Sequence, residues 1–379
     1  MAQQPQPEVV FVDAPPAVPA ALASVDAPVV GVDVERADAD RYFRRAALVQ
    51  VGVAGRCVLL DGTTSTTMPA LDAFLGPDRV AVLHALENDV VPLAAHGVSP
   101  DRLADTALAA ALLGLPTGLG PLLEQVLEVE LTGDKDAFQR ADWAARPIPP
   151  DMAAYAADDV VHLPALWREL ERRLRAADRR HWYEQELCEV ADRATRANRE
   201  WTKIKGSGRL TPEQRAILRA VWEAREALAR EHDIAPNRLL HDEVLRDLAV
   251  DPPRTEAQLV RRSQRRRSLL RRHAEPLLAA VLAGQAAAPE HRPRTRRWTD
   301  TDRAVFDALR RRRAEVAEEL GLDPGVLAPS QPLWGAVGAD PADGPELCAA
   351  AALTGWRVDV LADPLWEAYV TTREDHDGT

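Results

Sequence analysis

The sequence predicts an α/β domain, built from a mixed sheet flanked by helices, followed by two small all-α domains. Three observations predict this order. Val-rich segments of alternating hydrophobicity are confined to roughly the first 85 residues, helical patterns dominate from about residue 101, and strand signals are absent after about residue 178. The length of 379 residues also exceeds that of one typical domain.

The first domain contains four predicted strands, at residues 29–35, 48–53, 57–61 and 79–84. The turn at residues 54–56 makes the second and third strands part of an antiparallel meander. The fourth strand leads into a predicted helix from about residue 87 to 95. We expect residues 101–175 to be mostly helical, with breaks at 114–120 and 146–150.

Two helical segments follow this domain. The first begins at a capping box formed by Thr211 and Gln214, with Pro212 at the first helical position. The second has an apolar stripe of helical spacing that starts at Val305. Their similar rhythm predicts a degenerate repeat. The predicted domains are residues 1–200, 201–285 and 298–379, with a Pro- and Arg-rich linker at 286–297.

Composition limits the class of protein. The only cysteines are Cys57, Cys188 and Cys348, whose spacing excludes a CxxC zinc site and argues against a disulfide framework. The nine histidines lack metal-ligand spacing, so any metal is expected to be held by carboxylates, which favours Mg²⁺ or Mn²⁺. No secretory pattern and no run of 18 apolar residues is seen. We expect a cytoplasmic protein with no membrane association and no obligate protein partner.

Charge is unevenly distributed. The net charge is −12, yet residues 203–297 carry 21 Lys/Arg against 12 Asp/Glu, a local excess of +9 that leaves −21 elsewhere. A basic segment next to an acidic domain is typical of a phosphate-binding module beside a carboxylate metal site. For any single basic residue, a solvated helix face is an equally good interpretation.

Three groups of residues could carry chemistry. Asp33 and Glu35 share one face of a Val-rich strand, where two adjacent carboxylates repel unless a proton or cation lies between them. Asp89 follows a strand end, a position that helix capping alone would explain. Tyr155 and Asp159 lie one helical turn apart, as in an ordinary surface hydrogen bond. None of these groups is decisive alone.

Their order and spacing are more specific. Five segments resemble the motifs of the DEDD family of exonucleases, in the subtype that has a tyrosine: DVERADADRYFRRAALVQVG, VAVLHALENDVVPLAAHG, DTALAAALLGLP, QRADWAARP and YAADDVVHL. WTKIKGSGRL and the helical segments after it resemble the rest of ribonuclease D, including two HRDC domains. The resemblance implies a ribonuclease H-like first domain and covers nearly the whole chain.

The resemblance also implies residue roles. Asp33 is expected to bridge two divalent ions, Mg²⁺ or Mn²⁺, with Glu35 and Asp159 on the first ion and Asp89 on the second. Tyr155 is expected to orient the attacking water. These five residues form the predicted catalytic set, and the four acids form the predicted metal site.

A sister subtype with histidine offers a competing alignment, because His84 and Asp89 have its His-x4-Asp spacing. That alignment needs a further aspartate between Glu35 and His84. Asp61 and Asp72 are the available residues, and neither context fits. The tyrosine subtype is therefore the preferred interpretation.

The function implied is 3′→5′ exoribonuclease activity that releases nucleoside 5′-monophosphates, on transfer RNA precursors and other small structured RNAs. A DNA exonuclease and a catalytically silent RNA-binding protein are the alternatives. The candidate phosphate contacts lie in the first helical segment: Arg261, Arg262, Arg265, Arg266 and Arg267.

Overall fold

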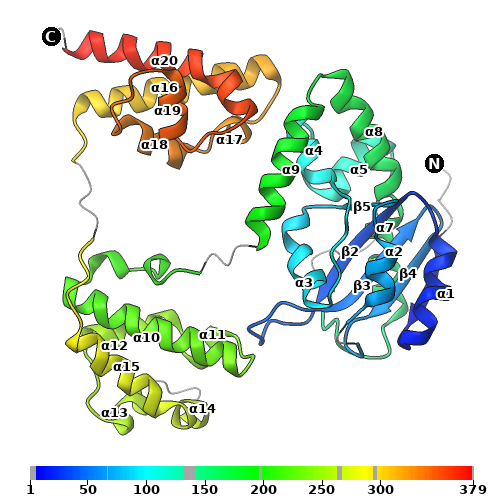
Figure 1. Cartoon of the computed structure of the whole chain (residues 1–379), viewed down its shortest axis with the longest axis horizontal. Coiled ribbons are helices and arrows are strands. Elements are labelled where there is room, and N and C mark those ends of the chain that lie inside the picture. The colour runs from blue at the N-terminus through cyan, green and yellow to red at the C-terminus, as the bar shows by residue number, and fades with distance from the viewer. Residues whose placement is uncertain are drawn as a thin grey trace. The chain divides into compact units, whose positions relative to one another are not determined.

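The computed structural model describes residues 6–65, 67–131, 138, 141–195, 199–262, 267–292 and 297–377. They form two compact units, most of whose elements are labelled in Figure 1. One unit contains a six-stranded sheet, helices α1–α5 and α7–α9, and helices α16–α20. The other contains helices α10–α15 together with the segment Arg36–Ala47.

The sheet is mixed, as the sequence predicts. Its strand order is β1-β4-β3-β2-β5-β6; β1 pairs parallel with β4, β2 with β5, and β5 with β6, whereas β3 and β4 are antiparallel. Seven of the eight residues of β3 are buried, as expected for a strand covered on both faces. The strands are β1 (Glu8–Val12), β2 (Val29–Arg36), β3 (Ala46–Val53), β4 (Arg56–Asp61), β5 (Val80–Leu83) and β6 (Leu103–Asp105).

The two edge strands were not predicted from the sequence. β1 lies among prolines and pairs with β4, about 48 residues away, so no local pattern reveals it. β6 has three residues and falls at the start of the region 101–175, which was expected to be mostly helical. Both strands exist because a long-range partner offers unpaired backbone groups.

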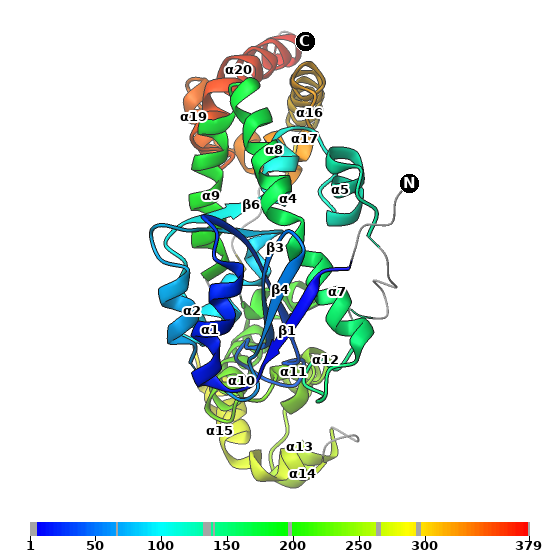
Figure 2. The same ribbon diagram turned by 90° about the vertical axis from the view of Figure 1, so that its right-hand side faces the viewer.

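Helices cover both faces of the sheet (Figure 2). Within the described residues, no helix combines the length and apolar character that a bilayer crossing requires. The helices of this domain are α1 (Val18–Leu22), α2 (Pro69–Phe74), α3 (Val90–Ala95), α4 (Thr106–Leu112), α5 (Leu119–Leu127), α7 (Pro150–Val161), α8 (Leu163–Ala176) and α9 (Arg180–Thr195).

Helix α7 approaches the central strands unusually closely. A Cβ atom built on Gly31 of β2 would overlap the carbonyl oxygen of Val160, and one built on Gly52 of β3 would lie 2.5 Å from Cγ2 of Val160. Only glycine permits this contact at both positions, because any side chain would push the helix away. Two glycines on neighbouring strands therefore fix the end of α7 against the sheet.

The C-terminal helices pack on α9 in the same unit. Trp356 is fully buried and stacks on Trp182, with 4.3 Å between ring centroids. Its indole Nε1 donates to Glu186 at 2.8 Å, and Arg357 forms a buried ion pair with the same carboxylate. The helices are α16 (Asp300–Leu320), α17 (Pro324–Leu327), α18 (Ser330–Val337), α19 (Gly344–Ala350) and α20 (Trp356–Asp377).

The second unit is a helical bundle around buried Leu and Val side chains. The segment Arg36–Ala47, which directly follows Glu35, is held by Asp233. The Asp233 carboxylate accepts the backbone N–H groups of Tyr42 and Phe43 at 3.2 and 3.0 Å. The helices are α10 (Pro212–Glu231), α11 (Pro236–Leu239), α12 (Asp242–Val250), α13 (Glu256–Arg261), α14 (Arg267–Arg272) and α15 (Ala274–Ala286).

The two helical segments repeat one local design. Helices α10 and α16 both start from a threonine capping box and carry a buried arginine that donates to a backbone carbonyl after the next short helix. That short helix starts with proline in both segments. Each feature recurs at an offset of 88 residues (299 − 211, 313 − 225, 324 − 236): Thr211 and Thr299, Arg225 and Arg313, Pro236 and Pro324.

The first prediction concerns the contact between α7 and the sheet. Gly31→Ala is expected to lower the free energy of unfolding by about 1–3 kcal/mol, because the added methyl group overlaps the Val160 backbone. Chemical denaturation measures the change. Gly120→Ala is the matched control, since a Cβ there meets nothing within 4 Å. Equal stability of both variants would contradict the close approach.

The second prediction concerns the packing of α20 on α9. Glu186→Ala leaves the Trp356 indole without its acceptor and Arg357 with only the Val326 carbonyl, and breaking such a largely buried pair costs about 3–5 kcal/mol. Limited proteolysis should then cut faster within residues 298–377. Glu169→Ala, which removes partly exposed ion pairs with Arg172 and Arg173, should cost about 1 kcal/mol and leave the proteolysis rate unchanged. A wild-type rate for Glu186→Ala would argue against this interface.

Candidate functional site

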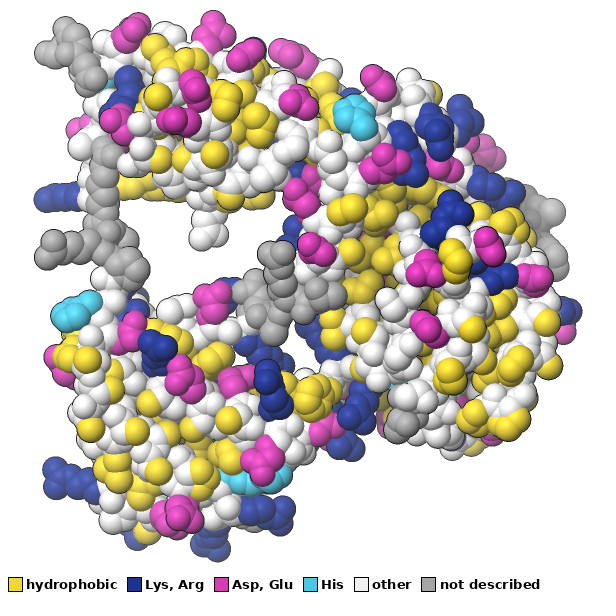
Figure 3. Space-filling model, in the orientation of Figure 1, with side chains coloured by type: hydrophobic (Ala, Val, Ile, Leu, Met, Phe, Trp, Pro, Cys, Tyr) yellow, Lys and Arg dark blue, Asp and Glu magenta, His cyan; other side chains and the backbone are white. Residues whose placement is uncertain are grey.

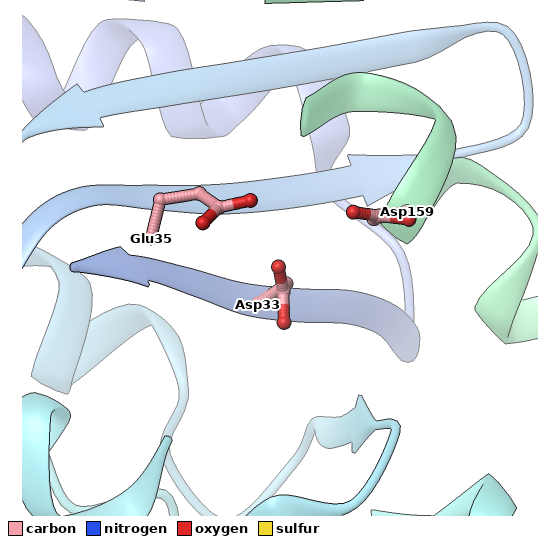
Figure 4. A group of neighbouring side chains, drawn as sticks. All are labelled: Asp33, Glu35 and Asp159. Atoms are coloured by element: carbon pink, nitrogen blue, oxygen red, sulfur yellow. The ribbon is translucent and has the colours of Figure 1, made fainter. Parts of the chain in front are cut away.

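Three of the predicted carboxylates converge in the first unit. Asp33 and Glu35 come from β2 and Asp159 from α7, and each offers an oxygen atom within 4.8 Å of the other two (Figure 4). All three side chains are partly buried. Residues that are 126 positions apart (159 − 33) thus form one cluster of negative charge.

The convergence follows from the backbone. Alternation along β2 puts Gly31, Asp33 and Glu35 on the same face of the sheet. Gly31 lies directly under Val160 of α7, and Asp159 directly precedes Val160 in the chain. The contact that glycine permits therefore brings Asp159 beside the two acids of β2.

Close packing of these acids opposes their ionisation. Burial raises the pKa of Asp33 to about 6. Burial, together with the charges of Asp33 and Asp159, raises the pKa of Glu35 to about 9. At neutral pH the cluster alone retains at least one proton. A cation bound among the three carboxylates would displace it and relieve the repulsion.

Tyr155 lies one turn before Asp159 on α7, and its side chain hydrogen-bonds the Asp159 carboxylate. Burial and the charges of Asp159 and Glu35 raise the pKa of the phenol above its ordinary value, so the hydroxyl keeps its proton. The Tyr155 ring packs against Phe138 at 5.0 Å and Trp143 at 6.2 Å between centroids. These aromatic contacts hold the hydroxyl at the edge of the carboxylate cluster.

Asp89 lies outside the cluster of three. It is 4% exposed and directly precedes α3, but its side chain does not cap that helix, so capping does not account for it. It follows β5, which runs parallel to β2, and the turn after β5 reaches the sheet edge that carries Glu35. The expected continuous helix 87–95 is a 3₁₀ turn, Leu86–Asn88, followed by α3, with Asp89 at the junction.

The acids required by the histidine subtype are engaged elsewhere. Burial raises the pKa of Asp61, but hydrogen bonds from Arg146 and Thr63 outweigh this effect and hold the pKa below its ordinary value. Arg146 donates to both carboxylate oxygens of Asp61, at 2.9 and 2.7 Å. Asp72 accepts the backbone N–H of Ser99 at 2.8 Å. Nδ1 of His84 lies 2.9 Å from the Thr106 hydroxyl. These contacts favour the tyrosine subtype.

Asp105 is a structural contributor that is not among the predicted site residues, although it begins the segment DTALAAALLGLP. Its buried carboxylate accepts N–H groups of Ala85 and Leu86 at 3.1 and 2.9 Å, and also caps α4. It thereby holds Ala85 in a left-handed conformation, φ 62°, just before the turn that carries Asp89. The sequence signal for this role of Asp105 is its position directly before a predicted helix, where an aspartate is typical of an N-cap.

The donor set fits divalent cations that prefer oxygen. An Mg²⁺ ion binds oxygen at about 2.0–2.1 Å, so oxygens that share one ion lie within about 4.2 Å of each other. The observed upper limit of 4.8 Å is close to that spacing. Within the described part of the chain, this is the one group of His, Cys, Asp and Glu side chains compact enough to hold a metal ion.

The structure describes the side chains of two of the five candidate phosphate contacts, Arg261 and Arg262. Arg261 is exposed, and Arg262 pairs with Asp251. Both line an open hollow of about 400 Å³ together with Arg254. Arg265 and Arg266 lie outside the described residues, as does the side chain of Arg267. Figure 3 shows Lys and Arg side chains on the visible face of α10–α15, with acidic side chains among them.

Comparisons with known proteins agree with this arrangement. A family profile described as 3′-5′ exonuclease matches residues 12–175, and one described as HRDC domain matches residues 214–281. The chain is 33% identical over 312 residues to a ribonuclease D of Xanthomonas oryzae pv. oryzae, covering 79% of this chain and 83% of that protein. It is 31% identical over 355 residues to a ribonuclease D of Gluconacetobacter diazotrophicus, covering 89% and 86%.

The fold has a solved counterpart. The crystal structure of RNase D from Escherichia coli, described as an exoribonuclease involved in structured RNA processing, superimposes with a TM-score of 0.77 at 24% identity. The alignment covers 96% of this chain and 99% of that chain, so the similarity includes the helical segments as well as the sheet. With the sequence identity to curated relatives, these matches show that the chain belongs to the ribonuclease D family.

Proposed function

We propose that the protein hydrolyses RNA from a free 3′ end at the cluster of Asp33, Glu35 and Asp159, with two divalent metal ions as cofactors. As a member of the ribonuclease D family it is a hydrolytic 3′→5′ exoribonuclease. The convergence of the three carboxylates on one face of the sheet is the observation that carries the site assignment. The products are nucleoside 5′-monophosphates.

Each acidic residue has a proposed role. Asp33 would contact both ions; Glu35 and Asp159 would complete the first site and Asp89 the second. When bound, two divalent ions would supply a water of lowered pKa and charge that stabilises the departing 3′ oxygen. The carboxylates would hold the positive charge of the ions at a fixed place beside the scissile phosphate.

Tyr155 would position the attacking water. Its raised pKa makes it a poor base, since the phenol stays protonated at neutral pH. A protonated hydroxyl can donate to Asp159 and accept a hydrogen bond from water at the same time. The hydrogen bond to Asp159 and the packing against Phe138 and Trp143 fix the direction in which the Tyr155 hydroxyl oxygen accepts this hydrogen bond.

The proposed substrates are transfer RNA precursors and other small structured RNAs with 3′ extensions. The helical unit of residues 203–297 would bind their phosphates, because it carries the excess positive charge of the chain. Arg254 and Arg261, at the hollow between α12 and α13, are its most direct candidates. Residues 298–379 carry 16 Asp/Glu against 7 Lys/Arg, so this segment is not proposed to bind phosphate.

A time course on a 3′-extended transfer RNA, with Mn²⁺ or with chelator, tests the proposed reaction. Nucleotides should be removed one at a time from the 3′ end, only with metal, and a DNA oligomer with the same 3′ overhang should be degraded much more slowly. Faster degradation of DNA would favour a DNA exonuclease. No metal-stimulated hydrolysis of either polymer would indicate a catalytically silent RNA-binding protein.

The third prediction concerns the metal ligands. Asp33→Asn and Asp159→Asn should each lower kcat by at least about 10³-fold, because a metal site loses a charged ligand. Neither should unfold the protein, since each removes charge from a repelling cluster. Asp158→Asn is the matched control: Asp158 lies on the same helix but is not in the cluster, and should keep near-wild-type activity. Near-full activity of either ligand variant would refute the site.

The fourth prediction concerns the tyrosine. Tyr155→Phe should lower kcat by about 10²-fold while the affinity for Mn²⁺ stays within about twofold, because only the positioning hydroxyl is lost. Tyr183→Phe is the control, since that buried hydroxyl accepts a backbone N–H from Asp105 at 2.7 Å and lies outside the cluster. It should cost stability and leave kcat unchanged. A Tyr155→Phe variant of normal kcat would exclude the positioning role.

A further inference from the structure

A buried amide lies in the central strand of the catalytic domain. Gln50 of β3 is 0% exposed, and neither its Oε1 nor its Nε2 atom has a hydrogen-bond partner among the described residues. Buried side-chain amides are almost always satisfied, because an unpaired one costs free energy that an apolar side chain of the same size would not. The surrounding strand residues Leu48, Val49 and Val51 are apolar and buried. Gln50 therefore calls for a specific explanation.

The register of the sheet places Gln50 beside Asp33. Gly31 of β2 and Gly52 of β3 both lie under Val160, so they occupy the same level on neighbouring strands. The two strands run in opposite directions (Figure 4). Asp33 lies two residues after Gly31 on β2, and Gln50 lies two residues before Gly52 on β3. Because the strands are antiparallel, Asp33 and Gln50 are displaced from the two glycines in the same direction.

The face is equally well defined. β3 pairs with β4 residue for residue from Leu48 to Val53, without a bulge, so Gln50 and Gly52 share one face of the strand. Gly52 faces α7, as do Gly31 and Asp33. The amide of Gln50 is thus directed to the side of the sheet where the three carboxylates meet.

We infer that Gln50 is a positioning residue of the reaction, whose Nε2 donates to the Asp33 carboxylate when the metal ions are bound. The inference rests on the proposed function, because it assumes that Asp33 contacts both ions. Carboxylates are acceptors only, and an amide is a neutral donor that does not compete with the cations for charge. Outer hydrogen bonds of this kind orient metal ligands and tune their affinity.

The test replaces the amide with an apolar side chain of similar size, in Gln50→Met and, as a second variant, Gln50→Leu. The apparent Kd for Mn²⁺ is measured by electron paramagnetic resonance titration, and thermal unfolding is measured in chelator. Each variant should bind Mn²⁺ roughly 10- to 100-fold more weakly. Each should unfold in chelator at a temperature no lower than wild type, since an unpaired polar group is removed.

Kinetics and a control complete the design. At saturating RNA, kcat at fixed sub-saturating Mn²⁺ should fall with the metal affinity, while KM for RNA stays unchanged. Val51→Ala removes buried volume from the opposite face of the same strand. It should lower the unfolding temperature and leave the Kd for Mn²⁺ at the wild-type value. If Gln50 had only a structural role, the Gln50 variants would likewise unfold at a lower temperature and bind Mn²⁺ with the wild-type Kd.

The outcomes separate this inference from the site assignment. If either folded Gln50 variant binds Mn²⁺ as wild type does, while Asp33→Asn does not bind, the role of Gln50 is wrong and the metal site stands. Equal binding by wild type and Asp33→Asn would instead overturn the proposed site. A tenfold or larger weakening in the Gln50 variants, with stability in chelator retained, supports the inference.

Discussion

The catalytic domain depends on one steric contact, the seating of Val160 over Gly31 and Gly52. At this point the backbone of α7 lies directly on Gly31 of β2, and the Val160 side chain occupies the space over Gly52 of β3. Asp159 is adjacent to the contact on the helix, and Asp33 is two residues away on the strand. Since interiors are close-packed, a helix fixed at this depth has little freedom to shift. The position of the third carboxylate is thus set by the absence of two side chains.

The contact must be firm because the site it creates is electrostatically unfavourable. Burial raises the pKa of Asp33, and burial together with the charges of Asp33 and Asp159 raises that of Glu35, so the protein without cations spends free energy to hold these groups together. That free energy must come from packing elsewhere in the domain, such as strands β3 and β4, in each of which all residues but one are buried. The same arrangement provides charge where a transferred phosphate and its metal ions would need it.

Local patterns predicted much of this molecule from its sequence. Alternation identified β2, β3, β4 and β5, the threonine capping box identified the start of α10, and the motif order identified the family. Long-range contacts escaped prediction. The pairing of β1 with β4, the packing of Trp356 on Trp182 and the docking of Arg36–Ala47 by Asp233 leave no periodic trace, because each joins segments distant along the chain.

The site shows the same division. Asp33, Glu35 and Asp159 could be selected from their motifs, whereas Gln50 reads as one polar residue in an apolar strand until the register is known. Asp89 was selected as a metal ligand, but the helix expected around it is interrupted at that residue. Its place relative to the cluster depends on a turn that Asp105 holds from another strand, which spacing alone does not encode.

Anomalous diffraction from crystals grown with Mn²⁺ would show directly whether the carboxylate cluster binds two ions. Two peaks about 3.5–4 Å apart are expected, one among Asp33, Glu35 and Asp159 and the other between Asp33 and Asp89. A single peak remote from β2, or none at saturating Mn²⁺, would contradict the proposed site.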